Sequence, residues 1–422
     1  MMAEETPSSS RTPTSAPPVH PGLSPFLRAP EGARTIFLVT TFAACGPLAG
    51  GLVLFGWRAG VVAALSVATC VLVEWLYFRV TRVPALLGRS HAVLTGLLLA
   101  LTLPAFVPWY VPVLGAAFAI IVGKAVFGGV GHFVWQPALV GRLAVAVLFP
   151  TQLTVASSIL TARQPVLAQN RLLLGDVRQA GKGEDVRPWR GRAGPQGKDA
   201  FLLTPPARTL RGLTDAAEPA FSAIVFRPRN LPRAKPAALL ELPPISNLLY
   251  GARPGGIGET SVILIVVAAL YLVYRNYLKW ELPLAFLAAA WCTVAVAPVY
   301  LAGPGQSVRT LWFPLLTDEG LDVAFTYVNY QLLSGQLLLA VLVVSAETTS
   351  RPVTRGGQVL FGLGCGVLAM LLQLYLRLPA PYEPIPCYVA VLAMNTFTPA
   401  IDRIWRPRVF GTRRLAFLRG KA

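Results

Sequence analysis

Ionisable side chains interrupt several apolar stretches of this 422-residue chain. A charge at membrane depth is costly, so such residues commonly line an ion path or face a buried partner. Glu259 follows three glycines in RPGGIGETS, and Glu347 lies among hydroxyl residues in SAETTSRP. We predict that both carboxylates line an ion path, although Glu347 could equally lie in a plain exit loop. The others are Glu74 and three residues that could instead pair or snorkel at the membrane surface: Lys124, Arg142 and Asp402.

The glycines before Glu259 also suit a phosphate-binding site. Glycine permits close approach of the backbone to a ligand, and a helix start exposes amide groups that bind anions. The candidate binding residues of this stretch are Gly256, Gly258, Glu259 and Thr260. The same residues could form an ordinary capped helix start, which the residues taken alone favour.

Composition predicts a membrane protein. Hydrophobic residues make up 54% of the sequence and charged residues 13%, whereas soluble domains carry about 25% charged residues. This excludes an ordinary soluble enzyme and predicts a polytopic protein in the lipid bilayer. The net charge of +18 is typical of basic loops beside anionic lipid, so no nucleic acid partner is expected. The five cysteines form no CxxC pair and the three histidines no cluster, so no metal site is predicted.

Ten apolar segments carry the candidate residues, in two sets of five. Weak matches between the sets, such as LTGLLLALTLP and LSGQLLLAVLV, predict two related halves, although apolar sequence also matches by chance. An odd number of spans would invert the second half and favour a site between the halves. The segments are Thr35–Trp57, Gly60–Phe78, Ala92–Phe106, Val111–Val126 and Pro137–Phe149, then Thr260–Tyr274, Leu282–Ala302, Gly335–Ser345, Gln358–Leu376 and Pro386–Pro399.

The predicted fold class is an all-α polytopic membrane protein with about ten transmembrane helices in two related five-helix halves. An irregular extramembrane insertion separates the halves. The domain boundaries are a disordered tail at 1–34, halves at 35–150 and 259–402, the insertion at 151–258 and a basic tail at 403–422. Because Lys and Arg near span ends stay in the cytoplasm, we predict cytoplasmic termini and an outward-facing insertion.

Five longer motifs resemble the RnfD and NqrB family, the membrane subunits of ion-translocating Rnf and Nqr electron-transport complexes. The resemblance covers about Ala85 to Gly411, and PGGIGETS and QPALVG are its most specific parts. In chain order the motifs are HAVLTGLLLALTLP from His91, GKAVFGGVGHFVWQPALVGR from Gly123, PGGIGETS from Pro254, SRPVTRGGQVLFGLGCG from Ser350 and VLAMNTFTPAIDR from Val391.

The resemblance implies a flavin-containing subunit that couples electron transfer to Na⁺ or H⁺ movement across a bacterial-type inner membrane. Such a subunit belongs to a translocase-type oxidoreductase and is not catalytic alone. The implied partners are other Rnf/Nqr-type membrane subunits and a flavin transferase. In similar proteins FMN is esterified through its phosphate to a threonine of the insertion, and the matching residue is Thr204, followed by Pro205. A second flavin is implied, and Gly128, Gly129 and Glu259 are candidate lining groups of a flavin or ion path.

The sequence differs from the family at the flavin-acceptor motif and at several ionisable positions. Phe201, Leu202 and Leu203 stand where Ser, Gly and Ala are usual, and bulky neighbours would obstruct a flavin transferase. Glu347 replaces a usual Asp, and Arg89 and His91 occupy a place where Asp and Ser are usual. Two alternatives therefore stay open, a non-redox channel or transporter and a cofactor-free structural subunit. The sequence leaves the ion, Na⁺ or H⁺, and the Rnf or Nqr type open.

Overall fold

A computed structural model describes residues 32–82, 90–157, 159–161, 200–202, 245–251, 255–301, 309–311, 321–333, 336–376 and 385–404. The chain divides into Met1–Gly32 and Ala33–Ala422, and every described helix and strand belongs to the second unit. Nearly all of the predicted tail at 1–34, most of the insertion and residues 405–422 lie outside the described residues.

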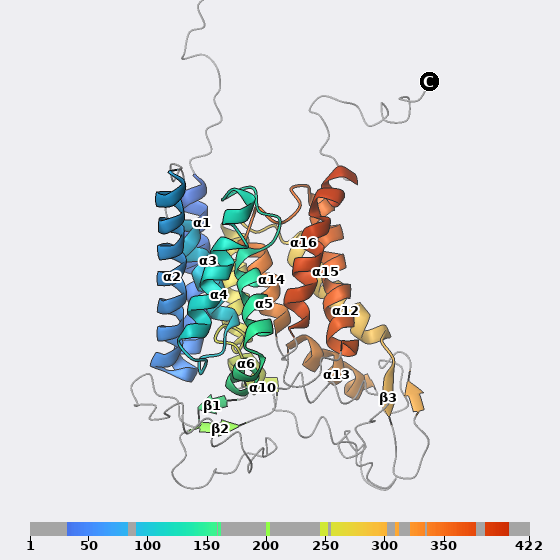
Figure 1. Cartoon of the computed structure of the whole chain (residues 1–422). Helices are drawn as coiled ribbons and strands as arrows, with labels where there is room; N and C mark the ends of the chain where they lie inside the picture. Colours follow the sequence, from blue (N-terminus) through green and yellow to red (C-terminus); the bar gives the residue numbers. More distant parts are fainter. Residues whose placement is uncertain are drawn as a thin grey trace, which may run out of the picture. The chain divides into compact units, whose positions relative to one another are not determined.

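The described residues are mostly helical (Figure 1). Besides the helices, the described residues form two short antiparallel strand pairs. Strand β1 (Ile159–Thr161) pairs with β2 (Ala200–Leu202), and β3 (Val299–Leu301) pairs with β4 (Arg309–Leu311). The helices before the insertion are α1 (Ala33–Phe55), α2 (Trp57–Thr81), α3 (Ser90–Thr102), α4 (Tyr110–Ile121), the 3₁₀ turn η1 (Ala125–Phe127), α5 (Pro137–Leu148) and α6 (Pro150–Ser157). Those after it are α10 (Ile245–Tyr250), α11 (Val262–Tyr274), α12 (Glu281–Val296), α13 (Leu321–Leu333), α14 (Gln336–Ala346), α15 (Arg355–Tyr375) and α16 (Pro386–Ile404).

Each of the ten predicted apolar segments contains a helix, but few of these helices are long enough to cross a bilayer alone. Among the described residues, four helices are long and apolar enough to cross a membrane: α1, α2, Tyr110–Phe127 and α15. The bent pair Tyr327–Leu333 and Gln336–Ala346 gives a fifth if it is one span. The other apolar helices, such as α3, α5, α11 and α12, are shorter. The structure thus confirms an apolar helical protein, while ten crossings are not confirmed.

Local sequence explains where several helices begin and end. Thr354 caps α15, because its hydroxyl oxygen accepts a hydrogen bond from the Gly357 amide at 3.1 Å. Pro137 occupies the first position of α5, where a missing amide hydrogen costs nothing. Arg82 ends α2 in the left-handed conformation, with φ of 56°.

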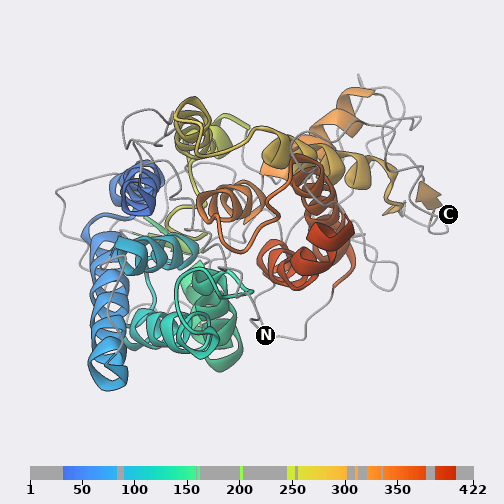
Figure 2. The ribbon, with the colours of Figure 1, turned by 90° about the horizontal axis from the view of Figure 1, so that it is seen from above.

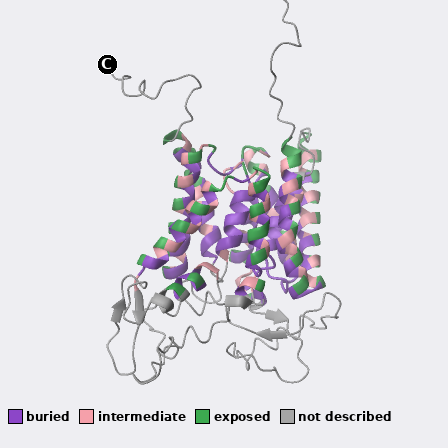
Figure 3. Ribbon diagram, turned by 180° about the vertical axis from the view of Figure 1, so that it is seen from behind, coloured by how far each residue is buried: buried purple, intermediate pink, exposed green. Residues whose placement is uncertain are grey.

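Buried and exposed faces of the helices agree with a lipid environment. Helix α14 lies near the centre of the bundle seen from above (Figure 2), and Leu337 through Ala346 are all buried. It packs against α3, α11, α12 and α16. The outward faces remain exposed (Figure 3) and carry large apolar side chains, including Phe42, Leu72, Leu270 and Phe397. Large exposed apolar side chains in this number are expected where helices face lipid or another protein.

Small residues allow α12 and α15 to approach closely. A side chain on Gly366 would meet the backbone carbonyl oxygen of Phe286, and one on Gly362 would lie 2.8 Å from the Leu282 carbonyl oxygen. The two glycines are four residues apart on one face of α15, the spacing that permits close packing of membrane helices.

We expect Gly366→Ala to destabilise the protein by about 1–3 kcal/mol, because the new methyl group must push two backbones apart. Gly364→Ala is the matched control on the same helix. Its methyl group would meet only the flexible end of Met394, so it should be neutral or slightly stabilising. Thermal unfolding of the detergent-solubilised variants measures both. Equal effects would contradict the proposed backbone contact.

Candidate functional site

Four titratable side chains form a continuous buried chain of polar contacts. The Lys124 ammonium donates to Glu74 Oε1 at 2.7 Å and lies 3.1 Å from His91 Nδ1. The other ring nitrogen of His91, Nε2, lies 3.0 Å from Glu347 Oε2. Each of the four residues is at most 2% exposed. We call Glu74, His91, Lys124 and Glu347 the charged tetrad.

Each member of the tetrad comes from a different segment. Glu74 projects from α2, and His91 stands in the first turn of α3. Lys124 follows α4 directly before the turn η1, and Glu347 follows the last residue of α14. Segments far apart in the chain must therefore come together before the tetrad exists, and the start of α3 meets the end of α14 there.

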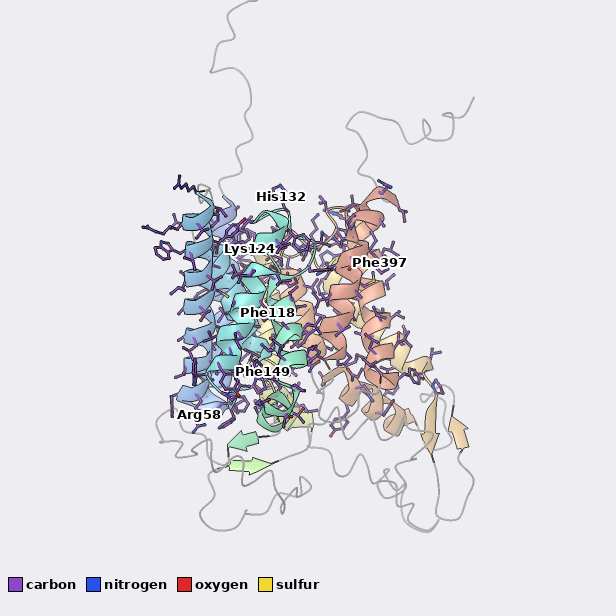
Figure 4. The ribbon with its side chains drawn as sticks, in the orientation of Figure 1. Arg58, Phe118, Lys124, His132, Phe149 and Phe397 are labelled. Atoms are coloured by element: carbon purple, nitrogen blue, oxygen red, sulfur yellow. The ribbon has the colours of Figure 1, made fainter. Side chains whose placement is uncertain are left out.

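The tetrad lies toward one end of the bundle. In Figure 4, Lys124 lies on the side of His132, whereas Arg58 and Phe149 lie toward the opposite end. Lys124 is one turn beyond the carboxyl end of α4. The site is thus inside the apolar bundle but closer to one surface than to the other.

Aromatic and hydroxyl side chains surround the His91 ring. Phe37 meets the ring edge-on with centroids 4.9 Å apart, and Phe133 lies tilted at 5.4 Å. Thr95 Oγ1 is 3.4 Å from His91 Nδ1. On the other side of the tetrad, the Thr349 hydroxyl donates to Glu347 Oε1 at 2.9 Å. This apolar shell limits access of water, so each charge interaction is stronger than it would be in solvent.

Charges of both signs meet in the tetrad. Two carboxylates face one ammonium, which leaves a net charge of −1 with a neutral imidazole and zero with a protonated one. Within the described residues, Glu74 Oε2 is buried without a hydrogen-bond partner. Arg351 adds a positive charge within electrostatic range of Glu347, while its own guanidinium donates to the Tyr277 carbonyl at 3.1 Å. A second positive charge thus lies near Glu347.

A second buried polar group surrounds Glu259. The Tyr388 hydroxyl donates to Glu259 Oε1 at 2.5 Å, and the Gly256 amide donates to Oε2 at 3.1 Å. Arg142 Nε donates to the Thr102 carbonyl at 3.1 Å, and Tyr388 is within electrostatic range of Arg142. We call Thr102, Arg142, Glu259 and Tyr388 the Glu259 cluster.

The tetrad and the Glu259 cluster lie at opposite ends of α3. The loop before α11 continues along the end of α3, because the Ile257 amide donates to Leu103 and the Gly258 amide to Leu101, both at 2.8 Å. From His91 to Thr102 the helix rises about 16 Å. Apart from Thr95, which lies beside His91, the side chains between are apolar, and five of them are buried leucines: Leu94, Leu97, Leu98, Leu99 and Leu101. An apolar barrier thus separates two polar sites.

The loop before α11 does not fit a flavin phosphate. Its amides from Gly256 to Glu259 all have acceptors within the protein, and the Glu259 side chain fills the space beside Gly256. A carboxylate in that space repels an anion. We therefore assign no phosphate to Gly256, Gly258 or Thr260 and derive no step through a flavin there.

The paired glycines Gly128 and Gly129 lie in a more open place. Both have positive φ, 95° and 104°, and nothing lies within 4 Å of where a side chain would stand. The Gly129 amide donates to the Lys124 carbonyl at 3.1 Å, so this loop is tied to the backbone beside the tetrad. Substituted residues would be strained at both positions.

The structure brings together only some of the residues singled out in the sequence. Glu74, Lys124 and Glu347 share one site through His91, whereas Glu259 and Arg142 belong to the other cluster. Asp402 stands apart and accepts a hydrogen bond from the Val353 amide at 3.3 Å. Thr204 lies outside the described residues. Sequence reasoning did not identify Tyr388, since a tyrosine in an apolar segment gives no signal of the carboxylate it contacts.

Comparison with known proteins gives the family. Residues 22–411 match the NQR2, RnfD, RnfE family. This chain belongs to that family. Its membership and its apolar helices together make it a multi-pass membrane protein.

Relatives within the NQR2, RnfD, RnfE family match nearly the whole chain. The D subunit of an ion-translocating oxidoreductase complex from Halorhodospira halophila is 30% identical, with 93% of this chain and 95% of the relative covered. The D subunit of a proton-translocating ferredoxin:NAD(+) oxidoreductase complex from Clostridium ljungdahlii is 26% identical, with coverage of 93% and 96%. The D subunit of a Na(+)-translocating ferredoxin:NAD(+) oxidoreductase complex from Acetobacterium woodii is 25% identical, with coverage of 93% and 95%. Relatives of similar identity thus carry names with different ions.

Proposed function

We propose that this chain is the D-type membrane subunit of an Rnf-type complex in which electron transfer drives ion movement. The near-complete coverage of relatives with this name supports the assignment. The observation that carries it is the presence of two buried ionisable clusters within an apolar bundle, because intramembrane charges usually mark an ion path. The partners are then the other membrane subunits of the complex, in a bacterial-type inner membrane.

Two related halves are part of this proposal. The packing pairs α1 with α3, α2 with α4, α3 with α5 and α4 with α5 recur after the insertion as α11 with α14, α12 with α15, α14 with α16 and α15 with α16. Equivalent helices of the two sets also touch, as α1 with α11, α3 with α14 and α5 with α16. The pattern supports ten membrane-inserted helices, with short α3 and α14 meeting at the interface, as in inverted-repeat transporters.

The ion path follows from the same interface. Glu347 and Glu259 stand at opposite ends of α3, and buried leucines separate them. Alternating exposure of the two clusters would carry an ion past this barrier without an open pore. With the termini in the cytoplasm, as the basic residues favour, the tetrad faces the cytoplasmic side and the insertion faces outward.

Purification tests this function. An affinity tag on the native chain should co-purify other Rnf-type subunits, and the complex in proteoliposomes should move ions when a reductant such as reduced ferredoxin transfers electrons to NAD⁺. Deleting the chain should abolish coupled ion movement. A chain that purifies alone and conducts ions without electron transfer would contradict the proposal and favour a non-redox channel.

A covalent FMN on Thr204, attached by a flavin transferase, is a separate proposal that rests on the family resemblance. Bound flavin would supply one- and two-electron redox chemistry. We expect the denatured wild-type chain to show flavin fluorescence and an added mass of one FMN, and Thr204→Ala to lose both. Thr214 belongs to the same insertion but not to the acceptor motif, so Thr214→Ala is the control and should keep the flavin.

The sequence around strand β2 favours the alternative of a cofactor-free structural subunit. Phe201 and Leu202 pair with β1, and in the sequence they stand three and two positions before Thr204. If neither wild type nor variant carries covalent flavin, the chain is a cofactor-free structural subunit, or any second flavin is bound without a covalent bond.

A further inference from the structure

The contacts of the charged tetrad do not suit a free metal cation. Hard cations take several oxygen ligands at once. Here the carboxylates already face the Lys124 ammonium and the His91 ring, at 2.7 and 3.0 Å. Among the described residues, no three His, Cys, Asp or Glu side chains are grouped so that they could hold a metal ion. A lysine fixed to the chain thus stands where a mobile cation would have to bind.

The same contacts suit proton transfer through His91. A neutral imidazole carries a proton on one ring nitrogen and accepts on the other. Because the Lys124 ammonium only donates, Nδ1 is the acceptor and Nε2 carries the proton toward Glu347. Both transfers span ordinary hydrogen-bond distances, 3.1 Å at Nδ1 and 3.0 Å at Nε2.

We propose that the charged tetrad is a proton relay and that the ion coupled to electron transfer in this chain is H⁺. The proposal rests on the proposed function and names its ion. In the relay step, the Lys124 ammonium gives a proton to His91 Nδ1 while the proton on Nε2 passes to the Glu347 carboxylate. The products are a neutral amine, the other imidazole tautomer and a carboxylic acid, so protons and total charge are conserved and no electrons move.

Glu74 completes the relay at the other end. It stands across Lys124 from His91, and its Oε2 is buried without a hydrogen-bond partner among the described residues. A proton taken up by this carboxyl group can return Lys124 to the ammonium form. Glu347 releases its proton on the side of the residues after α14. The relay therefore runs from α2, across the start of α3, to the end of α14.

Among the described residues, few other charged or titratable groups face the tetrad. On α2, Cys70 is within electrostatic range of Glu74 and Lys124. On the Glu347 side, Arg351 is within range of the carboxylate. The groups that pack on the ring from α1 and from the loop after η1 are Phe37 and Phe133, which do not titrate. His91 is thus the one group of the tetrad with two transferable positions between a donor and an acceptor.

His91→Gln separates a relay from a structural contact. A glutamine amide can still hydrogen-bond Glu347 or Lys124, but it cannot carry a proton from one to the other. We use the whole complex in phosphatidylethanolamine and phosphatidylglycerol vesicles, with a pH-sensitive dye for H⁺ and radioactive sodium for Na⁺. Wild type should take up H⁺ whether or not Na⁺ is present. His91→Gln should lower H⁺ moved per electron by about a hundredfold, the lower end of the range for positioned proton-transfer groups.

His132→Gln is the matched control, since His132 is exposed and outside the tetrad, and it should keep the wild-type ratio. An unchanged ratio in His91→Gln would overturn the relay. Uptake of Na⁺ in place of H⁺ by the wild type would also overturn it while leaving the proposed function intact. Absence of any ion movement during electron transfer would overturn the proposed function and the relay together.

A measurement on the wild-type complex covers the case in which His91→Gln does not assemble. Redox-difference infrared spectroscopy should show a carboxylic acid band that appears during turnover and shifts in heavy water. The band should move when the glutamates carry heavy carbon, and it should vanish in Glu347→Gln. A spectrum without such a band would contradict proton arrival at Glu347.

Discussion

Lys124→Met is expected to destabilise the protein by about 3–5 kcal/mol, the usual cost of removing one partner from a buried ion pair. The variant leaves Glu74 buried without a counter-charge, and both side chains are only 3% exposed. Methionine has nearly the length of lysine, so the loss is electrostatic and not a packing defect. Thermal unfolding of the detergent-solubilised chain, followed by tryptophan fluorescence, measures the change.

The double variant Glu74→Gln and Lys124→Met tests the electrostatic cause. Replacing both members removes the orphaned charge, and we expect it to recover most of the stability lost in the single variant. Arg355→Met is the control for loss of a positive charge, because its contact with Glu281 is 3.7 Å long and Arg355 is 79% exposed. If the single and double variants unfold alike, Lys124 does not neutralise Glu74.

The segment pattern was predictable from the sequence, and the crossing count was not. Hydrophobic runs predicted the places of α1, α2 and α15 within a few residues. However, α3 and α14 are shorter than a membrane crossing and are buried against other helices. The hydropathy of a single segment does not reveal such burial. Helix α13 was not predicted, because Asn329 and Gln331 interrupt its apolar pattern.

The site was only partly predictable for the same reason. The cost of a buried charge identified Glu74, Lys124 and Glu347 as residues that need partners, but sequence cannot say which ones pair. Their partners are separated by 50 positions for Glu74 and Lys124 and by 256 for His91 and Glu347. The sequence could not show that the amides before Glu259 already donate to carbonyl groups at the end of α3 and to Glu259 itself. A phosphate would need those amides free.

A large effect on transport is expected from Glu259→Gln. This change removes the negative charge and nearly keeps the size of the side chain. The single amide oxygen can still accept from either Tyr388 or the Gly256 amide, while the NH2 group replaces the other acceptor. Glu259 is 7% exposed and lies beyond the leucines of α3 from the tetrad, which makes it the carboxylate able to receive the ion on that side. Because positioned proton-transfer groups contribute about 10²–10⁴-fold, we expect ion transport per electron to fall about a hundredfold.

Tyr388→Phe and Glu281→Gln sharpen this test. Tyr388→Phe leaves the Glu259 carboxylate without its 2.5 Å hydrogen bond, so transport should fall less than in Glu259→Gln while the charge needed for the ion remains. Glu281→Gln removes a carboxylate at the start of α12, outside both clusters, and should leave transport unchanged. Reconstituted complex with each variant gives transport and electron transfer in one experiment. If Glu259→Gln transports like the wild type, the ion does not pass Glu259, and the path from the tetrad must leave the bundle along another face of α3.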